Sequence, residues 1–333
     1  MLSLALLSTP AVIAAGVLLL ERWWPVPPGY HPFSLFTLFA QQCFRRAWRP
    51  QRDTLPQQQL AGLLATWLLL ILLLLPAWFF YELSEIPAAI AAILLWLALY
   101  QAPARIALTR LEQALAKRQK NVAREQLRFL DGRDSASLSP LGLARAGGDL
   151  HWLSWYQQHY LPWLGFLLGG PILALALRGV AELSWQWPPG HQRLQGFARV
   201  VNLLQLVIDT LGAITLLPLL WLSLLVVRGP RTLQRQLHSL GQTSAASHWS
   251  PAQRALFSAL AQLLQAPLGG PIQFQGARVR RQRFGPPLPA QLSAETAATL
   301  MAISRRVTGI FDLLLIAAAL AYSIGTLLLT SAW

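Results

Sequence analysis

The sequence predicts an all-α polytopic membrane protein with about six transmembrane helices and helical cytoplasmic segments. Of its 333 residues, 54% are hydrophobic and 12% are charged, whereas soluble domains carry about 25% charged residues. The mean hydropathy is +0.43, and long apolar runs alternate with segments rich in Lys and Arg. These observations exclude an ordinary soluble enzyme, and the high apolar content excludes a disordered chain.

Each apolar run is a candidate span, because crossing a bilayer takes about 20 apolar residues. The runs lie at about residues 2–20, 60–80, 86–104, 161–177, 204–227 and 311–332. The first ends at Glu21 and has no basic residue before it, so we interpret it as an anchor rather than a cleaved signal peptide. The fourth is short and is interrupted by Gly169, Gly170 and Pro171. We treat residues 1–333 as one integral-membrane domain.

The basic residues predict the orientation of these spans. The formal net charge is +14, which in a soluble protein would suggest nucleic-acid binding. Here 24 of the 27 Lys and Arg residues fall in segments 21–59, 105–160 and 228–309. Because cytoplasmic loops collect Lys and Arg, we place these segments in the cytoplasm and both termini in the periplasm of a bacterial inner membrane. The expected partner is therefore the lipid bilayer, and no nucleic acid is expected.

The second cytoplasmic segment predicts a helix, a polar turn and another helix. Leucines recur near helical spacing between residues 105 and 130, and Gly132 is a plausible terminator. Ser139 followed by Pro140 is typical of a helix start. The turn between them, residues 131–135 (DGRDS), is either a simple connection or a polar loop that faces a phosphate or carboxamide substrate.

The third cytoplasmic segment carries an anion-binding pattern. Residues 267–271 (PLGGP) cannot form a regular helix, and the paired glycines Gly269 and Gly270 allow backbone N–H groups to face an anion. Residues 278–283 (RVRRQR) follow, with Arg278 and Arg280 among four guanidinium groups that suit phosphate oxygens. The same run beside a membrane also suits anionic lipid. A rigid connection, 284–289, then leads to a predicted helix over 294–307.

Standard catalytic and metal motifs are missing from the sequence. There is no Walker loop, no zinc-protease motif and no credible serine triad, and the single cysteine, Cys43, matches no metal pattern. His151 and His159 lie eight residues apart without a carboxylate at ligand spacing. We therefore predict no metal ligands.

Several local motifs occur in an order that resembles a known family. They are residues 26–32 (VPPGYHP), 130–135 (LDGRDS), 168–171 (LGGP), 268–276 (LGGPIQFQG) and 280–285 (RRQRFG). This order resembles the CobD/CbiB family, the adenosylcobinamide-phosphate synthases of cobalamin biosynthesis, from about residue 20 to 310.

The resemblance implies an ATP-dependent amide ligation. In that reaction a carboxylate of adenosylcobyric acid is joined to aminopropanol or its phosphate ester, so the expected partners are a corrinoid and ATP, with Mg²⁺ as the usual companion of phosphoryl chemistry. The candidate catalytic residues are Asp134 and Asp149. The candidate substrate- or anion-binding residues are Arg133, Arg178, Arg199, Gly269, Gly270, Arg278 and Arg280.

Several acidic positions of the family are replaced in this chain. At seven positions the resemblance implies an acidic residue or an asparagine where this chain has another residue. They are Leu153, Ser154, Gln157, Ala181, Ser184, Val201 and Asn202. Residues 191–195 (HQRLQ) are closer to AmpE, a related membrane protein. We therefore keep a second hypothesis, a catalytically inactive AmpE-like relative that acts as a membrane sensor or scaffold. A transporter is disfavoured, because only Asp209 and Asp312 lie near the depth of a span.

Overall fold

The computed structural model describes residues 9–23, 30–49, 53–187, 196–241, 249–274, 277–279, 281–285 and 294–331. The helices of the first half are α2 (Pro10–Trp23), α3 (Phe33–Ala47), α4 (Leu55–Glu82), α5 (Pro87–Ala98), α6 (Ala102–Ala116), α7 (Lys120–Asp131), α8 (Pro140–Trp155) and the π-helix η2 (Tyr156–Tyr160). Those of the second half are α9 (Leu161–Gln186), α10 (Arg199–Arg228), α11 (Pro230–Gly241), α12 (Pro251–Leu264) and α13 (Ala294–Ser331).

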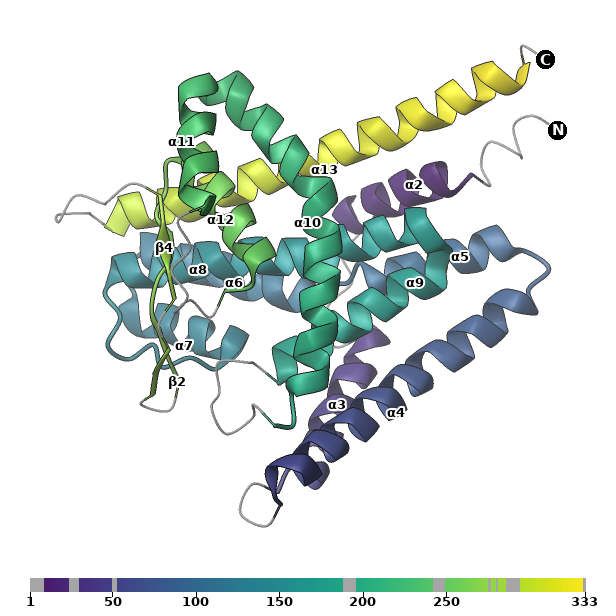
Figure 1. Cartoon of the computed structure of the whole chain (residues 1–333), viewed down its shortest axis with the longest axis horizontal. Helices are drawn as coiled ribbons and strands as arrows, with labels where there is room; N and C mark the ends of the chain where they lie inside the picture. Colours follow the sequence, from purple (N-terminus) through teal and green to yellow (C-terminus); the bar gives the residue numbers. More distant parts are fainter. Residues whose placement is uncertain are drawn as a thin grey trace.

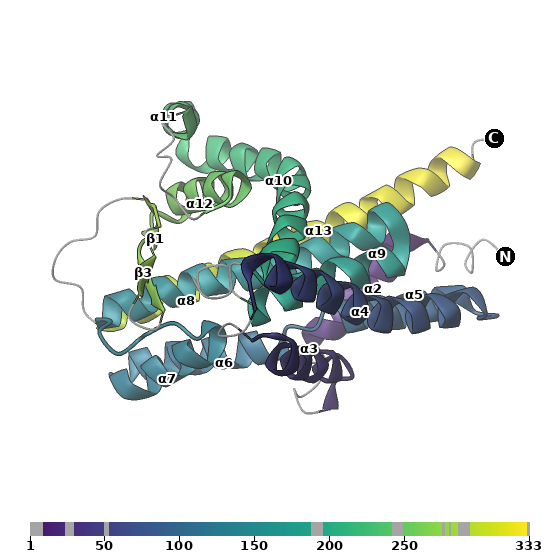
Figure 2. The same cartoon turned by 60° about the horizontal axis from the view of Figure 1, so that its bottom comes forward.

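Within the described residues, four very short strands interrupt this helical fold. They are β1 (Leu268–Gly269), β2 (Ile272–Phe274), β3 (Ala277–Val279) and β4 (Arg283–Phe284). β1 pairs with β4 and β2 pairs with β3, both antiparallel. The strands lie beside α8 at one end of the molecule, whereas the α4–α5 turn and the C-terminal part of α13 lie at the other (Figures 1 and 2).

The fold is all-α, as predicted, and suited to a membrane. Within the described residues four helical stretches are long and apolar enough to cross a bilayer: Leu55–Glu82, Pro87–Ala116, Pro140–Gln186 and Arg199–Arg228. A shorter apolar helix covers Pro10–Glu21. The count of six spans and their sidedness stay predictions.

The surface of α4 fits contact with lipid. Trp67, Leu68, Ile71 and Leu75 are each more than half exposed. Soluble monomers rarely present such a contiguous apolar face. Lipid tails are the natural neighbours of this helix, because they accept apolar side chains without the cost of exposing them to water.

The prediction of a single helix over 105–130 is wrong, because this segment forms two helices, α6 and α7. Arg118 adopts a left-handed φ of 57°, and the two helices pack against each other. The apolar face shifts register at this turn: Val122, seven residues after the buried Leu115 and so at helical spacing from it, is 43% exposed, whereas Ala123 is fully buried. Helical spacing alone hides such a shift, since each half is periodic by itself.

Two other expectations concern helix breaks. The interruption at Gly169 and Gly170 is confirmed as a kink in α9, where both glycines have non-helical backbone angles. The helix predicted over 294–307 has the right start but is too short, because α13 continues without a break to Ser331. The last predicted span is therefore the second part of a 38-residue helix.

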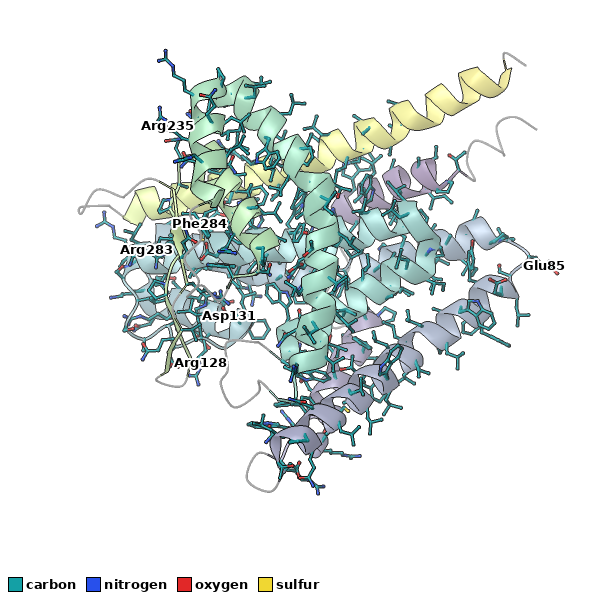
Figure 3. All side chains as sticks on the ribbon, viewed as in Figure 1. Glu85, Arg128, Asp131, Arg235, Arg283 and Phe284 are labelled. Carbon is teal, nitrogen blue, oxygen red and sulfur yellow. The ribbon has the colours of Figure 1, made fainter. Side chains whose placement is uncertain are left out.

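The topology has a direct test in reporter fusions. Glu85 lies in the α4–α5 turn, far from Asp131 and Arg283 (Figure 3). A reporter that is active only in the periplasm is expected to work when fused after Glu85 and to be silent after Arg118, because the flanking segments differ in Lys and Arg content. Reporter activity after Arg118 together with silence after Glu85 would show that the orientation is opposite to the predicted one.

Candidate functional site

The polar turn after α7 is held in a defined shape. Gly132 ends α7 with a left-handed φ of 68°, which glycine adopts without a steric penalty. Arg133 is 4% exposed and forms an ion pair with Asp131. The Asp134 N–H donates to the Gln273 carbonyl oxygen at 2.8 Å. This bond joins the turn to the β2 strand, more than a hundred residues later in the chain.

The paired glycines lie against α8. Gly269 and Gly270 have φ values of 72° and 102°, and the Gly269 N–H donates to the Asp149 carboxylate at 2.7 Å. The Gly270 N–H donates to the Gln282 carbonyl oxygen at 3.0 Å. A Cβ at residue 270 would lie 3.1 Å from Cζ of Arg145, so this guanidinium lies directly on the glycine backbone.

Helix α8 contributes two charged side chains, Arg145 and Asp149, next to the paired glycines. Ser139 caps the helix by accepting from the Gly142 N–H at 3.1 Å, as its sequence predicts. Arg145 and Asp149 are one turn apart, so they share a face of the helix. Asp149 is 3% exposed and lies in the electrostatic field of Arg133, Arg145 and Arg281.

These elements enclose a cavity of about 200 Å³, which we call the basic pocket. Its lining includes Arg133, Asp134, Arg145, Asp149, Gly269, Gly270 and Gln273. The five sequence candidates among these residues come from three distant segments of the chain. The fold thus brings these five residues together in one cavity.

Arg281 does not line the basic pocket, but its charge acts on the Asp149 carboxylate. Its guanidinium lies 4.5 Å from the centre of the Trp249 ring. Burial lowers the pKa of Arg281 to about 10; repulsion from Arg133 also lowers it, while Asp149 and Asp131 raise it. Arg281 is still protonated at neutral pH. The pocket and its surroundings therefore combine several guanidinium groups with few carboxylates, which favours an anionic ligand.

Two of the other predicted arginines, Arg178 and Arg199, do not line the basic pocket. Arg178 is 3% exposed and donates to Glu182 at 2.9 Å and to the Tyr100 carbonyl oxygen at 3.2 Å. Arg199 is exposed at the first residue of α10. The side chain of Arg278 and the whole of Arg280 lie outside the described residues.

Arg178 borders a second and larger cavity of about 690 Å³. The cavity lies between α3, α7 and α9, and Thr37, Gln158 and Trp185 also line it. Asp131 and Gly132 face this cavity, whereas the next two residues, Arg133 and Asp134, face the basic pocket. One polar turn thus separates the two cavities.

The replaced acidic positions do not form a metal centre. Gln157 donates to the Asp209 carboxylate, with its Nε2 3.2 and 3.3 Å from the two oxygens. Gln205 and Gln253 donate to the same carboxylate at 2.7 and 2.8 Å. Amide groups therefore satisfy this buried acid, and they tie η2, α10 and α12 together. Within the described part of the chain, no three His, Cys, Asp or Glu side chains are placed to share a metal ion.

Arg145 is the functional candidate that the sequence reasoning missed. Its spacing of four residues from Asp149 was the available signal, because a pair at that spacing faces one side of a helix. Arg281 and Arg283 belonged to the basic run, but the run did not indicate which of its members lie near Asp149 and Gly270.

Comparison with known proteins identifies one match. A family model described as CobD/Cbib protein matches residues 13–304. No curated protein sequence and no solved structure matches the chain.

Proposed function

This chain belongs to the CobD/CbiB family of cobalamin biosynthesis, and from that premise we propose that it joins a corrinoid carboxylate to an amine in an ATP-dependent amide ligation. The corrinoid is adenosylcobyric acid, and the amine is aminopropanol or its phosphate ester. The protein acts at the bacterial inner membrane, with the basic pocket open to the cytoplasm.

The observation that carries the proposal is the position of the turn 131–134 between the two cavities. The larger cavity, at about 690 Å³, has the volume of a small-molecule site and receives the side of the corrinoid that bears the carboxylate. The basic pocket receives phosphate groups. The carboxylate and the phosphates then meet at the turn.

The residues of the basic pocket suit ATP phosphates better than a protein-held Mg²⁺. Guanidinium groups of Arg133 and Arg145 bind phosphate oxygens in a fixed geometry. ATP supplies the free energy for the amide bond. The carboxylate of Asp149 already accepts a hydrogen bond from Gly269 and is surrounded by cations, so these residues do not fit a metal site and no step is assigned to one.

Genetic complementation tests the proposal. We expect the full chain to restore cobalamin synthesis from cobyric acid in a strain that lacks the synthase. Arg145→Ala is expected to reduce the rate of amide formation about tenfold or more, because hydrogen bonds to charged groups contribute about 1.5–3 kcal/mol. Arg199→Ala removes the same charge from an exposed position and is expected to retain most of the rate.

A specific observation supports the alternative of an inactive relative. Leu153 and Val201 stand at expected acidic positions, and neither side chain can bind a metal or move a proton. If the expressed and membrane-inserted chain fails to complement but still binds ATP, the scaffold or sensor function is favoured.

If Arg199→Ala is as harmful as Arg145→Ala, the basic pocket is not the phosphate site.

A further inference from the structure

Helix α10 is apolar along its outer face. Six apolar side chains at helical spacing are each more than half exposed. They are Leu203, Val207, Leu211, Ile214, Leu222 and Val226. Between its first and last residues the helix contains one charge, Asp209, which is 1% exposed and lies on the opposite face. Because soluble monomers rarely expose so long an apolar face, lipid is the expected neighbour of this one.

Both ends of α10 lie on the same side of the molecule. Just before the helix begins, the Phe197 carbonyl group lies against Gly62, in the second turn of α4. From there α4 runs away towards the α4–α5 turn (Figures 1 and 2). At the other end of α10, Arg228 donates to the Leu263 carbonyl oxygen of α12 at 3.1 Å, and α12 packs on β1 and β4. Both contacts are therefore on the side of the basic pocket.

The middle of α10 lies at the same depth. The Tyr156 hydroxyl of η2 donates to the Asp209 carbonyl oxygen at 2.6 Å. In the same short helix, His159 pairs with Asp312 at 3.3 Å, at the point where the last apolar stretch of α13 begins. Although α10 has 30 residues and is about 45 Å long, its start, middle and end thus contact one level of the protein. In Figures 1 and 2 it runs across the direction of α4 and α13.

Helix α9 makes the return crossing that α10 does not make. Gly169 and Gly170 have non-helical backbone angles. A Cβ at Gly165 would lie 3.4 Å from Cα of Ala174, whereas nine residues of continuous helix extend about 13 Å. The chain therefore reverses at the two glycines, and the two parts of α9 lie side by side, each directed oppositely to the other.

We propose that α10 does not cross the bilayer but lies in its cytoplasmic leaflet, parallel to the membrane surface, with its outer face among the acyl chains. Arg199 and Arg228, the first and last residues of the helix, are exposed and lie at the level of the lipid phosphates, which suit guanidinium groups. The contact with lipid holds α12, and with it β1 of the basic pocket, against the membrane. The inference does not depend on the proposed ligation, because no reaction is needed to measure topology or depth.

The distribution of basic residues agrees with this arrangement. With α10 in the plane of the membrane and α9 as two spans, the number of spans is still six, and both termini are still on one side. Residues 178–199, which a crossing α10 would place in the periplasm, now join segments 21–59, 105–160 and 228–309 in the cytoplasm. These four segments contain all 27 Lys and Arg residues, as the preference of cytoplasmic loops for positive charge favours.

Cysteine labelling of the full chain in bacterial spheroplasts tests the topology. Cys43→Ala removes the native thiol, and Arg199→Cys and Arg231→Cys each place one cysteine at an exposed position at either end of α10. A membrane-impermeant maleimide is expected to label neither variant in intact spheroplasts and both after permeabilisation. Glu85→Cys and Arg118→Cys are the controls for the periplasmic and cytoplasmic sides. Labelling of Arg199→Cys or Arg231→Cys in intact spheroplasts would overturn the proposal.

Spin-label depth in nanodiscs of phosphatidylethanolamine and phosphatidylglycerol is the second test. Labels on Leu203→Cys, Ile214→Cys and Val226→Cys are expected at one shallow depth, because helices in the interface lie about 5–10 Å into the boundary of head groups and acyl chains. On the spanning helix α4, a label on Ile71→Cys is expected on the order of 15 Å deeper than one on Leu60→Cys, given the rise per residue. If the label on Ile214→Cys is as deep as that on Ile71→Cys, with Leu203→Cys and Val226→Cys shallow, α10 is a span and the proposal fails.

Discussion

Replacing Asp149 with alanine is expected to lower the free energy of unfolding by on the order of 1–3 kcal/mol, the usual cost of leaving a buried hydrogen-bond donor without its acceptor. Asp149 is 3% exposed and is the acceptor for the Gly269 N–H. Its loss removes a negative charge from the electrostatic field of Arg133, Arg145 and Arg281. It also leaves a buried N–H group without this acceptor.

Asp149→Asn separates these two effects. Asparagine keeps an oxygen that can accept from Gly269 but removes the charge, so we expect a smaller loss of stability than for alanine. The arginines then attract a dissolved anion more strongly, because the competing carboxylate is gone. Added inorganic phosphate is therefore expected to raise the melting temperature of Asp149→Asn more than that of the native chain.

Tryptophan fluorescence of the full chain in detergent micelles measures both quantities. Glu125→Gln again provides a control, since it removes a carboxylate from an exposed position on α7. If phosphate stabilises the native chain and Asp149→Asn equally, the carboxylate does not compete with anions, and the basic pocket loses its assignment as a phosphate site.

The fold was largely predictable because hydropathy and helix ends are local properties. The apolar run over 60–80 lies within α4, and the ends of α7 and α8 follow from Gly132 and Ser139. The register shift between α6 and α7 was not predictable, because Val122 and Ala123 suit a helical face equally well. Only packing against other helices decides which of the two is buried.

The basic pocket was predictable from the resemblance, whereas its charge balance was not. The resemblance made Asp134, Asp149 and Gly269 candidate site residues, and all three line the cavity. Their contacts, however, depend on side-chain directions that spacing does not give. Arg178 illustrates this limit, because its helix turns it towards Glu182 and Tyr100 rather than towards the pocket.

The cavity between α2, α6, α8 and α13 could not be predicted from the sequence. His159 and Asp312 are more than a hundred and fifty residues apart, and neither has a motif around it. Their proximity results from the packing of α13 along α8. A single sequence contains no signal for such a pair, since the spacing rules for helices apply only within one element.

Gly269→Ala is expected to abolish phosphate binding even though it adds only one methyl group. The residue has a φ of 72°, and the left-handed conformation costs other residues about 1–2 kcal/mol. The added Cβ would also lie 2.5 Å from the Gln282 carbonyl oxygen and 3.1 Å from the Phe284 ring. Because β1 pairs with β4 at this position, the strands must separate, and the Gly269 N–H moves away from Asp149.

Gly148→Ala is the matched control for this variant. It lies in α8 next to Asp149, and its added Cβ would be 3.6 Å from Leu268 and 3.8 Å from Ser304, which are ordinary contact distances. Alanine is favoured over glycine inside a helix by about 1 kcal/mol, so this variant is expected to keep or gain stability. Phosphate should still raise its melting temperature, but not that of Gly269→Ala. Equal phosphate effects on the two variants would mean that anion binding does not depend on the backbone conformation at Gly269, and that the arginines alone form the site.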